Sequence, residues 1–376
     1  MKTGLVLEGG AMRGMYTAGV LDVLLDRGVS FDGIMGVSAG ALFGPNFLSK
    51  QPGRVIRYNK RFIRDKRYKG WGCLIREGNL FSAGFAYGTV PRELDVFDDE
   101  TFKRSGVPFY AVVTGLESGE PEYMEIKSVF EDMDKLRASG SMPFVSRPVE
   151  IDGKLYLDGG VSDSVPYEAM KRMGYDRLAV ILTRDMDYKK KPMPALPIKL
   201  YFRRYPRFRD RLLKRHETYN RSVDRLRELE ERGEIFVIRP SVPIEIGRVE
   251  SDPDKLQQVY ELGLKDGEAA AEKLAAEGIS ARVIDMHTIK PLDTELVLKA
   301  AKETGAIVTT EEANVLGGLG AAVAEYRGET YPIPVVRHGV NDEFGRSGKA
   351  PLVLDAYGIN ADGIAAKAKQ AIAMKK

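Results

Sequence analysis

Short apolar runs alternate with helical patterns along this chain, and this alternation restricts its fold more than any other feature of the sequence. In the first part of the chain, the apolar runs that predict strands lie at 4–7, 34–37, 108–114, 155–158, 178–182 and 235–238. Apolar residues at helical spacing follow the first run, from Met15 to Arg27. Strands that alternate with helices form βαβ units, whose strands pair in parallel and whose helices cover both faces of the sheet. The sequence therefore predicts an α/β fold with a mainly parallel sheet.

The alternation stops and then restarts, which indicates two domains. Long helices are predicted at 208–232 and 254–277, the second rich in alanine and glutamate. After Gly278 come further predicted strands at 281–285, 306–310 and 333–336 and helices at 293–303, 317–327 and 361–374. A chain of 376 residues also suits two domains of about 100–200 residues each. We place the domains at 1–267 and 268–376, sharing the helix at 254–277.

Composition excludes several classes of protein. Hydrophobic residues make up 43% and charged residues 30% of the chain, which is too apolar for an intrinsically disordered protein. The formal charge of +3 is too near neutral for the whole chain to act as a nucleic-acid polycation. The single cysteine, Cys73, excludes an intramolecular disulfide and a cysteine-cluster metal site. The first residues lack the apolar stretch and cleavage site of a secretory signal, so we expect a cytoplasmic protein.

One serine lies in a pattern that suits a catalytic nucleophile. The sequence G-V-S-A-G at 36–40 fits G-x-S-x-G and centres on Ser38, between a predicted strand and a predicted helix. A serine needs a base, and the usual histidine is missing here, because the first histidine in the chain is His216. Asp158, at the end of a predicted strand and before two glycines, is the candidate base, with a plain turn residue as the alternative. Either Ser38 is not catalytic or its base is a carboxylate.

A glycine-rich turn after the first predicted strand can supply a third part of such a site. Its sequence is E-G-G-A-M-R-G at 8–14, directly before the first predicted helix. Backbone N–H groups of a turn that opens a helix can stabilise the negative oxygen that develops in acyl transfer. A nucleotide-phosphate cradle is the alternative, but the glycine spacing does not fit G-x-G-x-x-G and the chain has no P-loop.

Together and in this order, the three motifs resemble the bacterial branch of the patatin-like phospholipase family, over about residues 3–270. The resemblance implies a three-layer α/β/α domain that cleaves carboxylic esters of lipids through an acyl-enzyme. Ser38 would be the nucleophile and Asp158 the base, with neither a metal nor an organic cofactor. The resemblance assigns the oxyanion hole to the loop residues Gly9, Gly10, Ala11, Arg13 and Gly14. Ala11 departs from the family's usual third glycine; if that position has a positive φ, alanine costs about 1 kcal/mol or more.

The segment Lys199–Arg215 is strongly basic, with eight lysines and arginines against one acid, Asp210, and with aromatic residues between them. Three interpretations stay open. We favour a solvated helix face, whose arginines pair with acids such as Glu228, Glu230 and Glu231, over peripheral contact with an anionic membrane. Nucleic acid is the least favoured partner.

Residues 279–368 resemble a different family, the C-terminal domain of transketolases. The resemblance rests on V-I-D-M-H-T-I-K-P-L-D at 283–293, T-T-E-E at 309–312, G-G-L-G at 317–320 and D-E-F-G-R-S-G at 342–348. It implies a small α/β unit that helps to organise a dimer, so we expect a homo-oligomer through this domain. Thiamine diphosphate binds in two other domains of that family, so we expect no thiamine cofactor here. We interpret G-G-L-G as a helix-opening turn, and His287 and His338 as structural residues.

The two resemblances meet in the predicted helix at 254–277. Alanine and glutamate make this helix semi-rigid, whereas its interior glycines Gly263 and Gly267 weaken it by about 1 kcal/mol each. We know no functional reason to join a lipid hydrolase to a transketolase tail. We therefore hypothesise an engineered helix-fused chimera, with a natural fusion as the alternative. The competing function is that of a structural or self-assembling protein in which the hydrolase motifs are inherited.

Overall fold

The computed structural model describes residues 2–277, 284, 286, 288–343, 345, 353–354 and 356–375. It divides the chain into two compact units, 1–272 and 273–376. Helix α11 (Pro253–Glu277) contains the division point. The strand predicted at 281–285 lies almost wholly outside the described residues, and so does His287.

The first unit is built on an eight-stranded sheet in the order β5-β6-β3-β2-β1-β7-β8, with β4 paired to β3. The strands are β1 (Thr3–Leu7), β2 (Gly33–Val37), β3 (Phe109–Gly115), β4 (Pro121–Ile126), β5 (Val149–Ile151), β6 (Lys154–Asp158), β7 (Arg177–Ile181) and β8 (Ile235–Ile238). Strands β3, β2, β1, β7 and β8 are parallel, whereas β4, β5 and β6 are antiparallel to their neighbours. The predicted α/β fold with a mainly parallel sheet is confirmed, and the antiparallel edge was not predicted.

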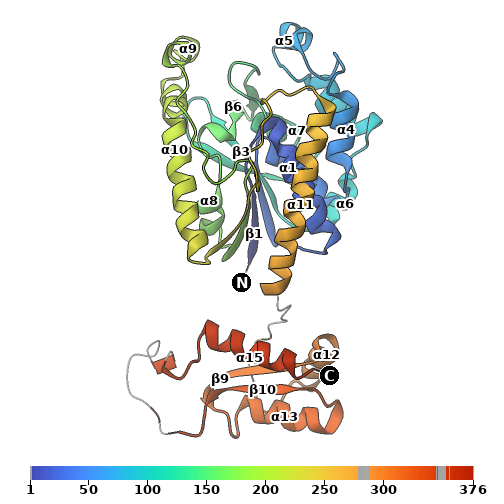
Figure 1. Ribbon diagram of the computed structural model, residues 1–376, viewed down its shortest axis with the longest axis vertical. Coiled ribbons are helices and arrows are strands. Elements are labelled where there is room, and N and C mark those ends of the chain that lie inside the picture. The colour runs from blue at the N-terminus through green and yellow to red at the C-terminus, as the bar shows by residue number, and fades with distance from the viewer. Residues whose placement is uncertain are drawn as a thin grey trace. The chain divides into compact units, whose positions relative to one another are not determined.

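Helices cover both faces of this sheet (Figure 1). On one face, α8 (Tyr167–Arg172) and α10 (Pro206–Glu231) pack against strand residues such as Val6 and Val180 in a buried cluster. The other face carries α1 (Gly14–Asp26). Since alternate residues of β1 point to opposite sides of the sheet, this strand contacts both helix layers. The remaining elements of this unit are α2 (Ala39–Phe43), α3 (Pro45–Leu48), α4 (Arg54–Phe62), α5 (Trp71–Glu77), the π-helical η2 (Phe85–Leu94), α6 (Asp99–Arg104), α7 (Met133–Ser139), α9 (Ala195–Tyr201) and the short turns η1 (Ala11–Arg13) and η3 (Gly159–Val161).

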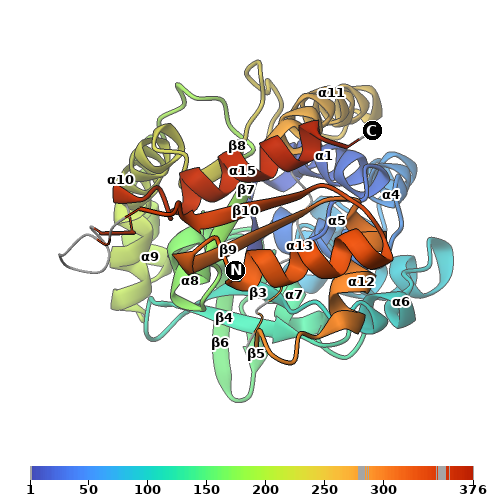
Figure 2. The ribbon, with the colours of Figure 1, turned by 90° about the horizontal axis from the view of Figure 1, so that it is seen from below.

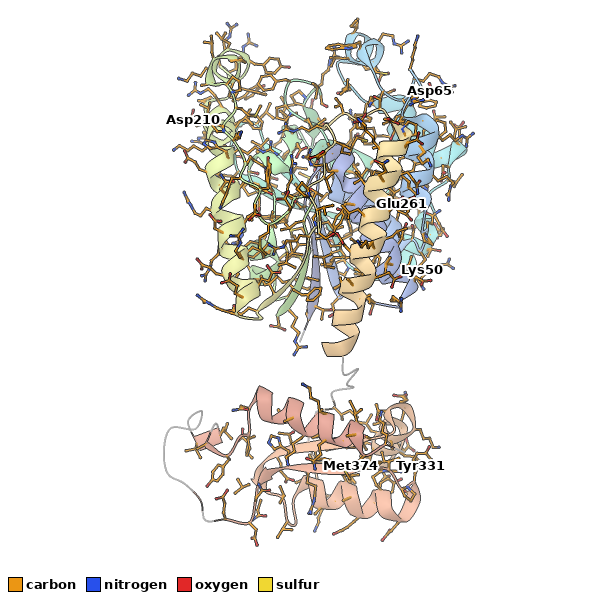
Figure 3. The ribbon with its side chains drawn as sticks, viewed as in Figure 1. Lys50, Asp65, Asp210, Glu261, Tyr331 and Met374 are labelled. Carbon is orange, nitrogen blue, oxygen red and sulfur yellow. The ribbon has the colours of Figure 1, made fainter. Side chains whose placement is uncertain are left out.

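Helix α11 packs directly on α1 through glycines. A Cβ at Gly263 would lie 2.2 Å from the Tyr16 carbonyl oxygen, and a Cβ at Gly19 would lie 2.2 Å from the Tyr260 carbonyl oxygen. Both distances are far below an ordinary contact, so the two backbones come together only because neither position has a side chain. Polar side chains such as the exposed Glu261 lie elsewhere on α11 (Figure 3). The interior glycine that weakens this helix in isolation is therefore a packing contact in the folded protein.

The described part of the second unit is a small α/β unit. Strands β9 (Ile307–Asn314) and β10 (Val335–Val340) pair in parallel. Helices α13 (Leu319–Thr330) and α15 (Ala361–Ala373) lie on opposite sides of them (Figure 2), and α12 (Thr294–Thr304) precedes β9. The Glu311 carboxylate accepts hydrogen bonds from the N–H groups of Leu319 (2.8 Å) and Gly320 (2.9 Å) at the start of α13. This glycine-rich turn is thus occupied by an internal carboxylate, as expected of a helix-opening turn.

Candidate active site

The sheet topology brings Ser38 and Asp158 together. Strand β4 pairs along β3 from Phe109 to Thr114 and so occupies one edge of β3. Both β2 and β6 must use the other edge, where Val37 lies opposite Val112 and Asp158 lies opposite Val113. Because β6 runs antiparallel to β3 while β2 runs parallel to it, the carboxyl ends of β2 and β6 meet there.

The Ser38 hydroxyl donates a hydrogen bond to Asp158 Oδ2 at 2.7 Å. Ser38 has φ 52° and ψ −117°, a sharp turn that projects the hydroxyl from the junction of β2 and α2. Its own N–H donates to Ser139 Oγ at 2.9 Å. The turn needs the glycine at 40, because a Cβ there would lie 2.5 Å from the Leu7 carbonyl oxygen. The strained conformation is thus held by the packing of α2 on β1.

Asp158 is a buried carboxyl group whose two oxygens are both used. Oδ2 accepts from Ser38, and Oδ1 accepts from the Gly160 N–H at 2.7 Å. Burial raises the pKa of Asp158, while the charge of Arg215 and these two hydrogen bonds oppose the rise. A carboxylate with a raised pKa is a better proton acceptor than one at the surface. The glycine at 159 is required as well, since a Cβ there would lie 2.2 Å from the Val112 carbonyl oxygen.

The glycine-rich turn lies against the serine. A Cβ at Gly9 would be 2.9 Å from Ser38 Cβ, and a Cβ at Gly10 would be 2.6 Å from Thr183 Oγ1. Ala11 has φ 48°, in the left-handed region that favours glycine. This alanine is therefore in the strained conformation that a positive φ at this position implies. The structure therefore places this loop where its backbone faces the nucleophile.

The backbone N–H groups of this loop fall into two sets. Met12 donates to the Arg248 carbonyl (3.3 Å), Arg13 donates to the Gly10 carbonyl (3.1 Å), and Gly14 donates within its own turn. Among the described residues, the N–H groups of Gly9, Gly10 and Ala11 find no acceptor. The predicted oxyanion set thus divides into three free donors and two residues, Arg13 and Gly14, whose N–H groups are already used.

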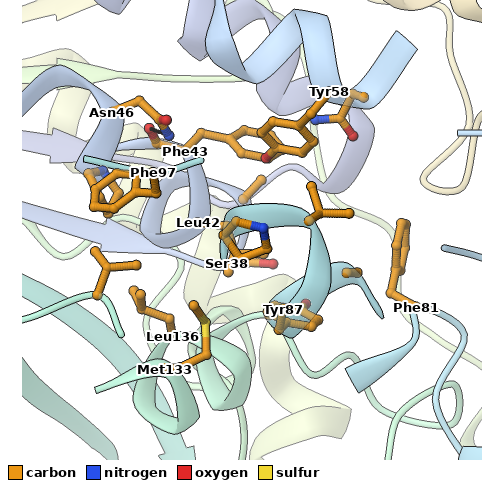
Figure 4. A pocket seen from close by; sticks show the side chains of 18 of the residues that line it. Ser38, Leu42, Phe43, Asn46, Tyr58, Phe81, Tyr87, Phe97, Met133 and Leu136 are labelled. Carbon is orange, nitrogen blue, oxygen red and sulfur yellow. Dashed lines mark hydrogen bonds between the residues drawn. The ribbon is translucent and has the colours of Figure 1, made fainter. Parts of the chain in front are cut away.

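An apolar pocket opens beside the serine (Figure 4). Its wall contains side chains from α2, α4, η2 and α7, elements that are far apart in the sequence. The labelled apolar and aromatic members are Leu42, Phe43, Tyr58, Phe81, Tyr87, Phe97, Met133 and Leu136. Such a lining suits a hydrocarbon chain. This pocket was not predicted from the sequence.

Comparison with known proteins bears on this geometry. The family model of patatin-like phospholipases matches residues 5–171, which contain Ser38, Asp158 and the glycine-rich turn. The model of the transketolase C-terminal domain matches residues 263–364. The chain joins a patatin-like phospholipase domain to a transketolase C-terminal domain. A third model, a domain of unknown function (DUF6363), matches residues 205–277, which form α10, β8 and α11 of the patatin-like unit.

Individual relatives match one part of the chain or the other. The uncharacterized protein YjjU of Escherichia coli is 28% identical over 275 residues, 70% of this chain and 75% of its own length. The 6-deoxy-6-sulfo-D-fructose transketolase subunit SqwH of a Clostridium species is 50% identical over 92 residues, 24% of this chain. This chain spans only 29% of the length of that subunit. Among solved structures, VipD from Legionella pneumophila is 13% identical and covers 72% of this chain and 67% of its own, with a TM-score of 0.35.

The patatin-like domain has a second cavity at the same serine, and its wall carries charged side chains among apolar ones. It shares Ser38, Ala11 and Met142 with the apolar pocket. The side chains of Asp158 and Arg13 also line it. Arg13 is buried and its Nε has no hydrogen-bond partner among the described residues. Burial, together with the charge of Arg184, lowers the pKa of Arg13 to about 10. The serine therefore lies at the junction of an apolar and a basic cavity.

Neither described histidine is a hydrogen-bond partner of Ser38 or Asp158 in the described part of the chain. His216 is on α10, where its Nδ1 is 3.1 Å from the Leu213 carbonyl oxygen. His338 is buried in the second unit, with Nε2 3.1 Å from the Gly358 carbonyl oxygen. In the described part of the chain, the hydrogen-bond partner of the Ser38 hydroxyl is Asp158.

The basic segment Lys199–Arg215 has a divided environment rather than one solvated face. Phe202 and Phe208 are in the core. Arg209 pairs with Asp210, on the outer side of α10 (Figure 3), and Arg211 pairs with Glu120. The predicted pairing with Glu228 and Glu230 is wrong, because these acids pair with Arg225 and Arg239. Lys199, Arg203, Arg204 and Arg207 are exposed and form no ion pair within the described residues. No helix in the described part of the chain is both long and apolar enough to cross a membrane.

Proposed function

We propose that the patatin-like domain hydrolyses carboxylic ester bonds of lipids with a Ser38–Asp158 dyad. The observation that carries this proposal is the 2.7 Å hydrogen bond from the Ser38 hydroxyl to a buried carboxylate, at a strand-to-helix turn. The adjoining apolar pocket supports an acyl chain as the part of the substrate held next to the serine.

The reaction proceeds in two halves. Ser38 Oγ attacks the ester carbonyl carbon as Asp158 Oδ2 takes the hydroxyl proton. Asp158 returns this proton to the leaving alcohol when the tetrahedral intermediate collapses, which leaves an acyl ester on Ser38. A water molecule then attacks that ester and gives its proton to Asp158. Collapse releases the fatty acid, and the proton returns to Ser38.

The negative oxygen of each tetrahedral intermediate needs donors that are already in place. The free N–H groups of Gly9, Gly10 and Ala11 are the candidates, because they line the cavity at Ser38 and have no acceptor among the described residues. Arg13 contributes positive charge beside the loop rather than a backbone donor.

The test uses a fluorophosphonate probe and a short p-nitrophenyl acyl ester. We expect wild-type protein to be labelled and to hydrolyse the ester, and Ser38→Ala to lose both properties. Ser30→Ala is the matched control, because Ser30 is exposed in the loop between α1 and β2. If wild-type protein shows neither labelling nor hydrolysis, the dyad has no catalytic role.

We also propose that the patatin-like unit contacts anionic membranes through α9 and α5. Both helices lie at the end of the sheet where the parallel strands finish (Figure 1). Each exposes apolar side chains, with Trp71 77% and Ile75 80% exposed on α5 and Leu196 68% and Leu200 64% exposed on α9. The unpaired basic residues beside α9 lie between Lys199 and Arg207. Apolar side chains beside free positive charge suit an anionic lipid surface.

Co-sedimentation with vesicles tests this membrane contact. We expect more binding to vesicles with phosphatidylglycerol than to vesicles of phosphatidylcholine alone, and weaker binding after Leu200→Gln. Val96→Gln is the control, because Val96 is also exposed but lies outside both helices. Binding that does not depend on lipid charge would eliminate the proposed role of the basic residues.

For the transketolase C-terminal domain we propose an assembly role, in which the whole chain forms a homo-oligomer. The family match at residues 263–364 favours this second function. Light scattering on the full chain tests it, and we expect a mass of at least two chains. A monomer at all concentrations would contradict the assembly role and leave the hydrolase proposal intact.

A further inference from the structure

The basic cavity at Ser38 has an excess of positive charge. Its wall carries five basic side chains and two acidic ones: Arg13, Arg184, Lys190, Arg215 and Arg248, against Glu8 and Asp158. The two acids have partners of their own. Asp158 accepts from Ser38 and Gly160, and Glu8 accepts from Thr183 N–H (2.6 Å) and Tyr219 hydroxyl (2.8 Å). Neither carboxylate lies within ion-pair distance of a basic side chain in the described part of the chain.

Three of these basic side chains contact neutral groups instead. Lys190 Nζ lies 3.6 Å from the centre of the Tyr219 ring, and the Arg184 guanidinium lies 4.1 Å from that of Tyr188. Arg215 Nε donates to the Gly160 carbonyl oxygen. Positive groups held over rings and a carbonyl keep N–H bonds free for a further acceptor.

The positive groups also destabilise one another. Burial lowers the pKa of Lys190 well below its usual value, and the charge of Arg215 lowers it further. Burial likewise lowers the pKa of Arg215; the charge of Asp158 opposes this decrease, and the charge of Arg248 adds to it. An anion in the cavity would reverse these effects, since it would pair with charges that now repel one another.

The basic residues come from separate segments that meet at the carboxyl ends of parallel strands. Arg184 and Lys190 follow β7, Arg248 lies between β8 and α11, and Arg215 is on α10. Crevices at the carboxyl ends of such strands are the usual ligand sites of open α/β sheets. The region 205–277, matched by the family of unknown function, thus supplies Arg215 and Arg248 to the wall.

We propose that this basic cavity binds the anionic head of the lipid substrate, a phosphate monoester or a phosphodiester without a cationic group. The apolar pocket and the basic cavity meet at Ser38, so an ester bond placed at the serine has its acyl chain on one side and its alcohol on the other. Net positive charge on the alcohol side favours a net negative head and disfavours a quaternary ammonium. This inference rests on the proposed hydrolase function and adds its substrate class.

Short-chain substrates test the inference without a membrane. The hexanoyl monoesters of glycerol phosphate, glycerophosphocholine and glycerol share one acyl chain and differ in charge. We expect wild-type kcat/KM to be about tenfold or more higher for the glycerol phosphate ester than for the glycerophosphocholine ester, as one charged hydrogen bond would give. Equal values for the two phosphate-containing esters would overturn the inference.

Variants locate the selectivity in the cavity. We expect Lys190→Gln and Arg248→Gln each to lower the ratio of kcat/KM for the glycerol phosphate ester to that for the glycerol ester about tenfold. Lys189→Gln and Arg232→Gln, which remove partly exposed charges outside the cavity, should keep the wild-type ratio. If Lys190→Gln does not fold, Arg248→Gln, on an exposed loop, carries the test. An unchanged ratio in folded cavity variants would refute the inference.

Inorganic phosphate separates a head-group site from a regulatory phosphate site. In a head-group site, phosphate competes with the glycerol phosphate ester and raises its KM, and Arg248→Gln reduces this effect. Phosphate that changes kcat for the neutral glycerol ester without competing would overturn the head-group assignment.

If the wild-type protein cleaves none of the esters, the hydrolase proposal fails, and calorimetric titration with phosphate still tests the cavity. Binding that is about tenfold weaker in Lys190→Gln would support an anion site, and no binding to wild-type protein would refute it.

Discussion

Replacing Gly263 by alanine distinguishes two explanations for a glycine inside α11. Helix propensity alone predicts a gain in stability of about 1 kcal/mol. Packing predicts a loss, because the new Cβ would lie 2.2 Å from the Tyr16 carbonyl oxygen of α1, where an ordinary contact is 3.4–4 Å. The obstacle is backbone, so no side-chain rotation relieves it. The helix α11 would have to move away from α1 by about 1 Å, in an interior that is packed as densely as a crystal.

The size of the loss follows from these two opposing effects. Overpacking a filled interior costs about 1–3 kcal/mol. The better helix propensity of alanine offsets up to about 1 kcal/mol of this cost. We therefore expect Gly263→Ala to lower the free energy of unfolding of the patatin-like unit by about 1–2 kcal/mol. At 2–4 °C per kcal/mol for a unit of this size, Tm falls by roughly 2–8 °C.

Urea denaturation followed by circular dichroism measures this change, and Gly72→Ala is the matched control. Gly72 lies on the exposed helix α5 with no atom closer than 4.0 Å to its would-be Cβ, so alanine should keep or raise stability. Gly19→Ala disturbs the same helix contact from the α1 side, because its new Cβ would lie 2.2 Å from the Tyr260 carbonyl oxygen of α11. The double variant with Gly263→Ala should cost less than the two single changes together, because one displacement of α11 makes room for both methyl groups. A Gly263→Ala protein at least as stable as the wild type would refute the close approach.

Three further predictions concern the active site. Gly9→Ala puts a Cβ 2.9 Å from Ser38 Cβ, so the loop must shift, and we expect kcat/KM for a p-nitrophenyl ester to fall about 100-fold; wild-type kinetics would contradict the placement of the loop. Protonated Asp158 cannot accept the Ser38 proton, and burial raises its pKa, so kcat/KM should fall as pH is lowered through that raised value; a pH–rate profile that stays flat down to about pH 4 would exclude Asp158 as the base. Ala11→Gly relieves a φ of 48°, and Lys50→Gly (Figure 3) relieves a φ of 53° outside both cavities. Thermal melts should therefore show a higher Tm in both variants, whereas kcat/KM should change only in Ala11→Gly. A loss of stability in both variants would show that positive φ is not strained here.

The contact between Ser38 and Asp158 could be predicted because its signals are local. The motif around Ser38 requires a strand, a turn and a helix within a few residues, and all three can be read from the sequence. The missing histidine pointed to a carboxylate, and Asp158 lies at the end of β6 as predicted. The direction of β6 could not be predicted, since β6 is antiparallel and shares an edge of β3 with β2 through contacts distant in sequence.

The antiparallel edge strands were missed for related reasons. Strand β4 is mostly half-buried and contains two glutamates and a proline, so it lacks the apolar run that marks a buried strand. Strand β5 has three residues, too few for any periodicity. Both owe their structure to pairing with β3 and β6 rather than to their own sequence.

The two cavities could not be predicted, because their walls assemble from many segments, but one signal was available. On α10, Arg211, Arg215 and Tyr219 are spaced four residues apart and share one helix face. Arg211 donates to the Gly119 carbonyl, Arg215 to that of Gly160, and Tyr219 to Glu8. The net charge of the segment Lys199–Arg215 does not reveal this arrangement, because it counts residues that face the protein and residues that face solvent alike.

The basic segment and the basic cavity therefore give two separable sources of positive charge at one end of the patatin-like unit. The exposed Arg207 lies in the first turn of α10, while Lys190 is half-buried and lines the cavity. Charge at an exposed position acts at the membrane surface and is screened by salt, whereas charge inside a cavity is screened much less. We expect Arg207→Gln to weaken binding to phosphatidylglycerol vesicles and Lys190→Gln to reduce selectivity among soluble hexanoyl esters, with the second effect persisting at high salt. If added salt abolished ester selectivity and vesicle binding in parallel, one surface field rather than a separate head-group site would account for both.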